Sequence, residues 1–156
     1  MSDAHLSLDN YLPYRLAVTS TAVSNLVSKV YESRYGLKIP EWRIVAVLSE
    51  DGPLSQYALV PRTAMDKVTV SRAAVTLSRR RLIKRAPHDR DGRSHILYLT
   101  EDGKNLYRDV APIAKHYESL VLQEFTPDQI TELKLLLLKC EVAALHAISV
   151  LMRQEP

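Results

Sequence analysis

The sequence predicts a mainly α-helical protein that carries one small β-hairpin. Two observations predict this fold class. Apolar residues recur every three or four positions along most of the 156-residue chain, whereas residues 83–99 show two strand-like stretches around a charged tip. Because 46% of the residues are hydrophobic, the chain can build a packed core and extensive disorder is not expected.

The first helix is expected over about residues 10–35, and Gly36 is a natural stop for it. Its apolar residues recur at helical spacing: Leu12, Leu16, Val23, Val27 and Val30. At 1.5 Å per residue this helix is about 39 Å long, which is long for a small domain. A long amphipathic helix at a chain end often packs against a second subunit, so we expect it to contribute to a dimer.

Two shorter helices are expected next. Pro40 suits the first turn of one of them, which ends at residues 50–53, and a short helix follows over roughly residues 55–60. The buried stripe of the longer helix is formed by Trp42, Val45 and Leu48. We expect Pro61 to stop the short helix or to lie in the turn that follows it.

A fourth helix is predicted within residues 65–83, with Asp66 as its N-cap. Val70, Ala74 and Leu77 share one face and form a buried stripe. Short polar or cationic side chains lie off this stripe near the start of the helix: Lys67, Thr69, Ser71 and Arg72. A helix end that reads a DNA groove needs such side chains, so this helix and the short one before it are typical of a helix-turn-helix.

The hairpin follows this helix directly, with Gly92 at its tip, and a helix-turn-helix followed by a β-hairpin is a winged helix. Alternating charges surround the glycine. We expect Arg93 to enter the minor groove of a duplex, with Asp91 bracing its guanidinium beforehand. Asp89 would orient Arg90 or an arginine at the end of the fourth helix in the same way. The alternative interpretation is an ordinary polar turn of mixed charge.

Positive charge is concentrated in the middle of the chain. The net charge is only +3, but residues 62–93 contain ten Lys or Arg against three acids, and the remainder is net acidic. A basic region of this kind is typical of a surface that binds phosphate, and nucleic acid is the expected target. The alternative is a solvated surface without a partner.

Two further helices are expected in the last third of the chain. The first covers about residues 100–125, and Pro112 should kink it. The second begins with a capping box, in which Thr126 is the N-cap, Pro127 the first helical residue and Gln129 the reciprocal partner. Residues 135–138 are four leucines, so this helix is apolar almost all round. We therefore expect it to be buried on two sides, by its own chain and by a partner chain.

The segment "MDKVTVSRAAVTLSRRRLIKRAPHDRDGRSHILYLTEDG", residues 65–103, resembles the core signature of the MarR family of bacterial transcription regulators. The family pattern includes DKxTVSR, a Leu-Ile pair at the start of the wing, D-x-R at its tip and LT-x-x-G after it. The chain departs from it at Arg81, where a glycine is common, and at Gly92, where the family often has a side chain. Arg81 would place an additional cation near the DNA backbone.

The resemblance implies a homodimer joined by a helical region formed by residues 1–36 and 101–156, with a DNA-binding lobe over residues 37–100. It also implies a pseudo-palindromic double-stranded operator, repression of nearby genes and release by a small ligand or an oxidant. The expected DNA-binding residues are Lys67, Thr69, Ser71, Arg72, Arg90, Asp91 and Arg93.

Small-molecule sensing is the expected switch. Cys140, the one cysteine, lies in an apolar stretch and is expected to be structural, and the five scattered histidines predict no metal site and no cofactor. The family pocket lies between the first, second and fifth helices. Candidate ligand contacts there are Arg15, Ser20, Asn25, Trp42 and His116. Chains similar to "IPEWRIVAVL" often respond to aromatic acids or their CoA thioesters. Alternatively, Trp42 is a core residue, and Arg15 and His116 have interface or surface roles.

Other classes of function are less well supported. Four glycines, no phosphate-binding loop and no nucleophile–base pair argue against an enzyme. The N-terminus lacks the features of a signal peptide, and no uninterrupted apolar run approaches the roughly 20 residues of a membrane span. We therefore expect a cytoplasmic protein without a membrane partner. Two alternatives remain open: a winged-helix protein-interaction module and a DNA-binding regulator without a ligand.

Overall fold

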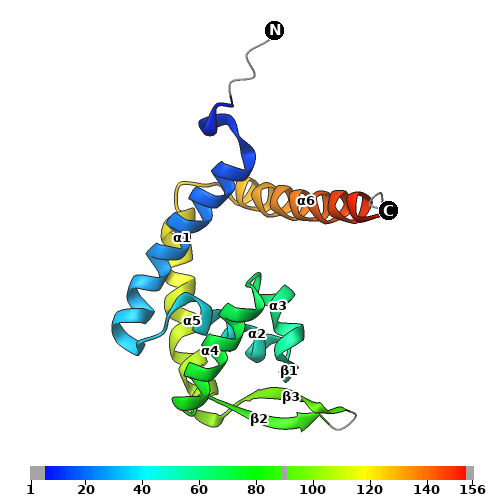
Figure 1. Ribbon diagram of the computed structural model, residues 1–156. Coiled ribbons are helices and arrows are strands. Elements are labelled where there is room, and N and C mark those ends of the chain that lie inside the picture. The colour runs from blue at the N-terminus through cyan, green and yellow to red at the C-terminus, as the bar shows by residue number, and fades with distance from the viewer. Residues whose placement is uncertain (1–5, 89–90, 154–156) are drawn as a thin grey trace. The chain divides into compact units, whose positions relative to one another are not determined.

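The computed structural model describes residues 6–88 and 91–153, except for the side chains of residues 88 and 91–94. The described elements confirm the predicted fold class, mainly α-helical with a small antiparallel sheet (Figure 1). A short 3-10 helix, η1, precedes them at Leu8–Asn10. The elements are α1 (Leu12–Tyr35), α2 (Ile39–Glu50), β1 (Leu54–Ser55), α3 (Gln56–Thr63), α4 (Lys67–Arg79), β2 (Ile83–His88), β3 (Asp91–Leu99), α5 (Glu101–Leu122) and α6 (Pro127–Met152).

The chain divides into two compact units between Tyr117 and Glu118. The first unit contains α1 to α4, the sheet and most of α5. The second contains the end of α5 and α6. The division at residues 36 and 100 into a helical dimerisation region and a DNA-binding lobe stays a prediction.

The core of the first unit is formed by the helices of the lobe together with the sheet. The largest fully buried side chains are Leu37, Ile44, Leu59, Leu77, Leu97, Val45, Val70 and Val110. The stripe predicted for α4 is therefore buried, as is Leu48 of α2, while Trp42 is half-buried. Tyr31, near the C-terminal end of α1, also belongs to this core, which fixes that end of α1 on the lobe.

The predicted hairpin is confirmed, and β2 and β3 lie side by side as an antiparallel ribbon along one edge of the lobe (Figure 1). Ile83 pairs with Leu99 at the base of the ribbon. A third strand, β1, joins the other edge of β3 through the pair Leu54 and Leu97, which gives the order β1-β3-β2. Two residues are too few to show an alternating pattern, so the sequence did not predict β1.

The end of α3 differs from the expectation. Pro61 lies inside the last turn of α3, and the helix continues to Thr63. The proline removes one backbone donor from the helix. Beside it, the Thr63 hydroxyl donates to the Leu59 carbonyl at 2.6 Å, and both residues are buried. The helix ends at Ala64, which has a left-handed φ of 51°.

A close contact joins the end of α4 to the start of α5. The Thr100 hydroxyl lies 2.7 Å from the Arg81 carbonyl and 3.1 Å from the Leu82 carbonyl, and accepts the Gly103 N–H at 3.1 Å. A Cβ on Gly103 would lie 2.1 Å from the Leu82 carbonyl oxygen. The pattern LT-x-x-G therefore has a physical basis here, because only a glycine permits this approach.

α6 begins with the predicted capping box. The Gln129 N–H donates to the Thr126 hydroxyl at 3.2 Å, and the Thr126 N–H donates to Oε1 of Gln129 at 2.9 Å. Within its own unit α6 has no buried residue, and its burial by the rest of the chain and by a partner chain stays a prediction. Cys140 is exposed as well.

Of the described helices, α6 is the one whose length and composition would permit it to cross a membrane, with a mean hydropathy of 1.9 over 18 residues. This finding is compatible with the expectation that no apolar run approaches the length of a membrane span, because the average covers residues on both sides of two charges. Lys139 and Glu141 interrupt the apolar run but do not lower the average enough to exclude it.

Candidate nucleic-acid interface

The N-terminus of α4 is held by a complete cap. Asp66 accepts the Thr69 N–H at 2.9 Å with one carboxylate oxygen and the Thr69 hydroxyl at 2.6 Å with the other. These hydrogen bonds, the one from the Thr69 hydroxyl above all, hold the pKa of Asp66 below its ordinary value. Asp66 is therefore ionised at neutral pH and favourably placed at the positive end of the helix dipole. The hydroxyl proton of Thr69 is used by this cap in the free protein.

The two faces of α4 differ sharply. Its buried face consists of Val70, Ala73, Ala74 and Leu77. At about 100° per residue, the opposite face carries Val68, Arg72 and Arg79, all of which are exposed. Lys67 is exposed beside them, and Ser71 is half-buried. The predicted cations therefore face solvent on a helix whose other side is anchored in the core.

Among the described residues of the lobe, two large apolar side chains are exposed. Tyr57 is 89% exposed and Val68 is 58% exposed, and each is the second residue of its helix, α3 and α4 respectively. Neither was predicted as a site residue. The sequence did carry a signal for Val68, because it lies opposite the apolar stripe of α4, but Tyr57 belongs to a helix too short to show a clear stripe.

One arginine of the basic run has a structural role. The Arg80 guanidinium donates to the Gly36 carbonyl at 2.9 Å and to the Tyr35 carbonyl at 2.6 Å. It also lies 3.8 Å from Oε2 of Glu41, a buried carboxylate that accepts the Lys38 N–H at 3.1 Å. Arg80 thus joins the C-terminal ends of α4 and α1 to the N-terminal end of α2.

The structure describes only part of the wing. Asp91 and Arg93 lie on β3, and their side chains are outside the described part of the chain, as is the whole of Arg90. Bracing of Arg93 by Asp91 stays a prediction. On the described part of the wing, Nζ of Lys84 lies 5.8 Å from the centre of the Tyr98 ring, within the range of a cation–π contact.

Trp42 belongs to an aromatic cluster in the core. Its ring stacks on Tyr107 with centroids 5.7 Å apart and lies 5.9 Å from Tyr31. Burial raises the pKa of Tyr31 above its ordinary value. Trp42 is half-buried in this cluster, and a role in ligand contact or in the core stays a prediction.

An open hollow of about 540 Å³ lies between α1 and α5. Its lining residues are Lys29, Val30, Ser33, Arg34, Pro112, Ile113, His116 and Tyr117. His116 is the one predicted ligand contact among them, whereas Arg15, Ser20 and Asn25 are exposed elsewhere along α1. Lys29 and Arg34 were not predicted, because nothing in a single sequence shows which turn of α1 faces α5.

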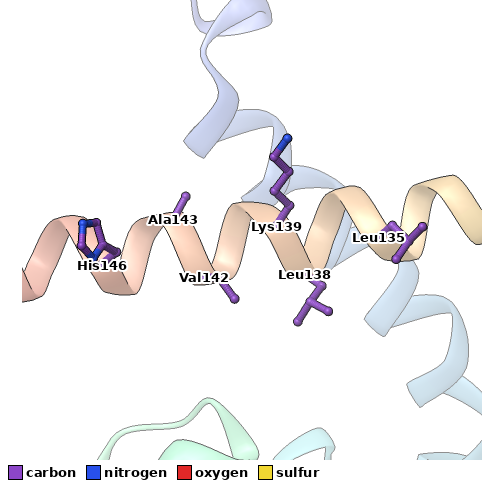
Figure 2. Close-up of a pocket in the computed structure, with 6 residues that line it drawn as sticks. All are labelled: Leu135, Leu138, Lys139, Val142, Ala143 and His146. Atoms are coloured by element: carbon purple, nitrogen blue, oxygen red, sulfur yellow. The ribbon is translucent and has the colours of Figure 1, made fainter.

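A second hollow lies along α6 alone and is almost entirely apolar. It is lined by Leu135, Leu138, Lys139, Val142, Ala143 and His146. Leu138 and Val142 point downward in the view of Figure 2 and Lys139 points upward, and all three line the hollow. This hollow is a helix surface rather than an enclosed site.

Comparison with known proteins gives consistent matches. A MarR family model matches residues 35–94. The transcriptional regulator MgrA of Staphylococcus aureus is 25% identical over 137 residues, which are 88% of this chain and 91% of MgrA. The transcriptional repressor NicR of Pseudomonas putida is 33% identical over 76 residues, which are 49% of this chain and 48% of NicR. A MarR/EmrR family regulator from an Acinetobacter species has a TM-score of 0.82 at 27% identity, covering 89% of this chain and 98% of that one.

A helix-turn-helix with an exposed cationic face, followed by a β-hairpin, defines a winged helix-turn-helix protein. The chain is similar to the MarR family of transcription regulators, by the family match over residues 35–94, by its sequence relatives and by its fold. The family and these relatives are regulators of transcription rather than enzymes.

Proposed function

We propose that this chain is a homodimeric repressor that binds a pseudo-palindromic operator and leaves it when a small aromatic acid binds. The observation that carries the proposal is the exposed face of α4, where Arg72 stands opposite a fully buried stripe and Lys67 is exposed at the first residue of the helix. A winged-helix module that bound only proteins would not need cations on this face.

The start of α4 has the properties that a major-groove reader requires. Lys67, Val68 and Arg72 are exposed there, Asp66 caps the helix, and its first turn contains no acid. In helix-turn-helix proteins the N-terminal residues of the second helix contact base edges. An E. coli MarR protein of the same fold, 16% identical with a TM-score of 0.75, has been crystallised with operator DNA.

Exposed apolar residues support the homodimer. In the single chain, the N-terminal half of α1 exposes Leu12 and Leu16, and α6 exposes Leu138 and Leu145. Exposed apolar surface of this extent marks an interaction site. A second copy of the chain would cover it and hold two copies of α4 about one helical turn of DNA, or about 34 Å, apart.

The hollow between α1 and α5 supports a small acidic effector. Lys29 and Arg34 line it together with His116, and such groups bind carboxylates through charge-assisted hydrogen bonds. Two similar proteins support this class of function. NicR is named a repressor, and 6-hydroxynicotinic acid regulates DNA binding by BpsR of Bordetella bronchiseptica. A ligand there would favour another spacing of the two recognition helices and so weaken operator binding.

The test begins with selection of bound fragments from a random duplex library. On the selected operator, Arg72→Ala should weaken binding by roughly 1–3 kcal/mol, because Arg72 would contact a base or phosphate at the start of α4. Arg79→Ala is the matched control, an exposed arginine two turns further along the same face. The operator is then used to test aromatic acids and their thioesters for release. Equal effects of the two substitutions would contradict the proposed docking, and absence of duplex binding at low salt would contradict DNA binding itself.

A further inference from the structure

We propose that Val68 reads the 5-methyl group of a thymine in the major groove of the operator. The inference rests on the DNA-binding function proposed above and adds to it a contact that selects one base. It follows from the exposure, the position and the chemistry of this side chain.

The exposure of Val68 has no structural explanation within the lobe. Its side chain is 58% exposed, while the neighbouring valine of α4, Val70, is 1% exposed. Val68 lies opposite the buried stripe, so it contributes little to the core. Valine is also a weaker helix former than alanine, so helix propensity does not explain its presence there. An exposed apolar residue in such a place indicates contact with a partner.

The position of Val68 selects DNA as that partner. It is the second residue of the recognition helix and shares its exposed face with Arg72, one turn further along. Lys67 is exposed next to it. These cations favour phosphates on either side of a groove, and the side chain between them would face the base edges. A protein or lipid surface would require a larger apolar patch than one valine flanked by cations.

The chemistry of Val68 selects thymine. An isopropyl group neither donates nor accepts a hydrogen bond, so it cannot recognise the polar atoms of the base edges. The apolar group that the major groove presents is the C5-methyl of thymine. Because valine is stiff at χ1 in a helix, the contact would cost little side-chain entropy. Burying one methyl is expected to change affinity about four-fold.

The experiment replaces each thymine of the selected operator, one at a time, by deoxyuridine, which removes only the methyl group. For the native protein, one position in each half-site should weaken binding about four-fold. Val68→Ala withdraws both γ-methyls and should reduce that penalty to less than about two-fold, with penalties at other thymines unchanged. Arg79→Ala serves as the control, because it should leave the whole uracil profile unchanged.

Each outcome supports or overturns the inference. Loss of uracil sensitivity at one position per half-site in the Val68 variant supports it. The same profile in native and variant protein, or no uracil-sensitive position at all, overturns it, since methyl effects that act through DNA shape would persist in the variant. Val68→Ser, which also removes both methyls, provides a second variant if the first is unstable on heating. Failure of every duplex to bind would instead contradict the proposed function.

Discussion

The winged-helix lobe and α6 use similar apolar residues in opposite ways. Leu59 and Leu77 of the lobe are fully buried, whereas Leu138 and Leu145 of α6 are 56% and 60% exposed. In the lobe, apolar residues occupy one face of each helix, so neighbouring helices and the sheet cover them. The leucines of α6 surround the helix, so a single chain cannot cover them. The lobe is therefore stabilised by its own chain, and α6 requires a second surface.

α1 combines both kinds of behaviour along its length. Its N-terminal half exposes Leu12 and Leu16, while Ser28 and Tyr31 near its C-terminal end are buried. The change occurs where the helix reaches the core of the lobe and the carbonyls held by Arg80. One helix thus extends from the surface that we assign to the dimer to the base of the DNA-binding lobe. A displacement at one end can be transmitted to the other, as a ligand switch requires.

The largest expected effect comes from placing a charge on α6. Leu138→Glu should convert a dimer into monomers, because a carboxylate would be buried in the interface without a partner. Since one lobe contacts only half of a palindrome, operator affinity should fall at least about 100-fold. Sedimentation and operator titration measure the two effects. Lys139→Glu, which replaces one charged side chain of α6 by another, is the control. A native protein that is already monomeric would show that a second copy of the chain does not cover α6.

A substitution at Gly103 tests the other half of the comparison, because it disturbs the lobe without touching α6. Gly103→Ala should lower the free energy of unfolding by about 1–3 kcal/mol, since its Cβ would collide with the Leu82 carbonyl. Urea unfolding measures the loss. The exposed neighbour Asp102, changed to alanine, should have little effect. If the glycine variant is as stable as native protein, the junction between α4 and α5 is more pliable than its geometry indicates.

The features that could be predicted from the sequence are those that depend on residues close together in the chain. The caps at Asp66 and Thr126 and the buried stripe of α4 depend on residues within a few positions of one another, and all were predicted and confirmed. The contact of Arg80 with Gly36 joins residues 44 positions apart, and no local pattern encodes it. The hollow beside Lys29 depends in the same way on how two distant helices meet. Val68 could have been noticed, because its place opposite the stripe is a local property.

The base of the winged-helix lobe is set by polar contacts as well as by apolar burial. Arg80 contacts two carbonyls at the end of α1, and its side chain is one-third exposed. Arg80→Met keeps much of the aliphatic stem but loses these hydrogen bonds, so the free energy of unfolding should fall by about 0.5–1.5 kcal/mol. Arg79→Met, at the exposed neighbouring position, is the control, and urea unfolding of both variants measures the difference.

Operator binding by the Arg80→Met variant distinguishes a role of Arg80 in stability alone from a role in positioning α4 relative to α1. If the guanidinium only stabilises the fold, affinity measured on folded protein should be native. If it also fixes α4 relative to α1, affinity should fall a few-fold, and any aromatic acid that the proposed screen finds to release the native protein should act less strongly, because displacement of α1 would no longer reach α4. Equal unfolding free energies for the two arginine variants would mean that burial of Tyr31 and Leu37 alone joins α1 to the lobe.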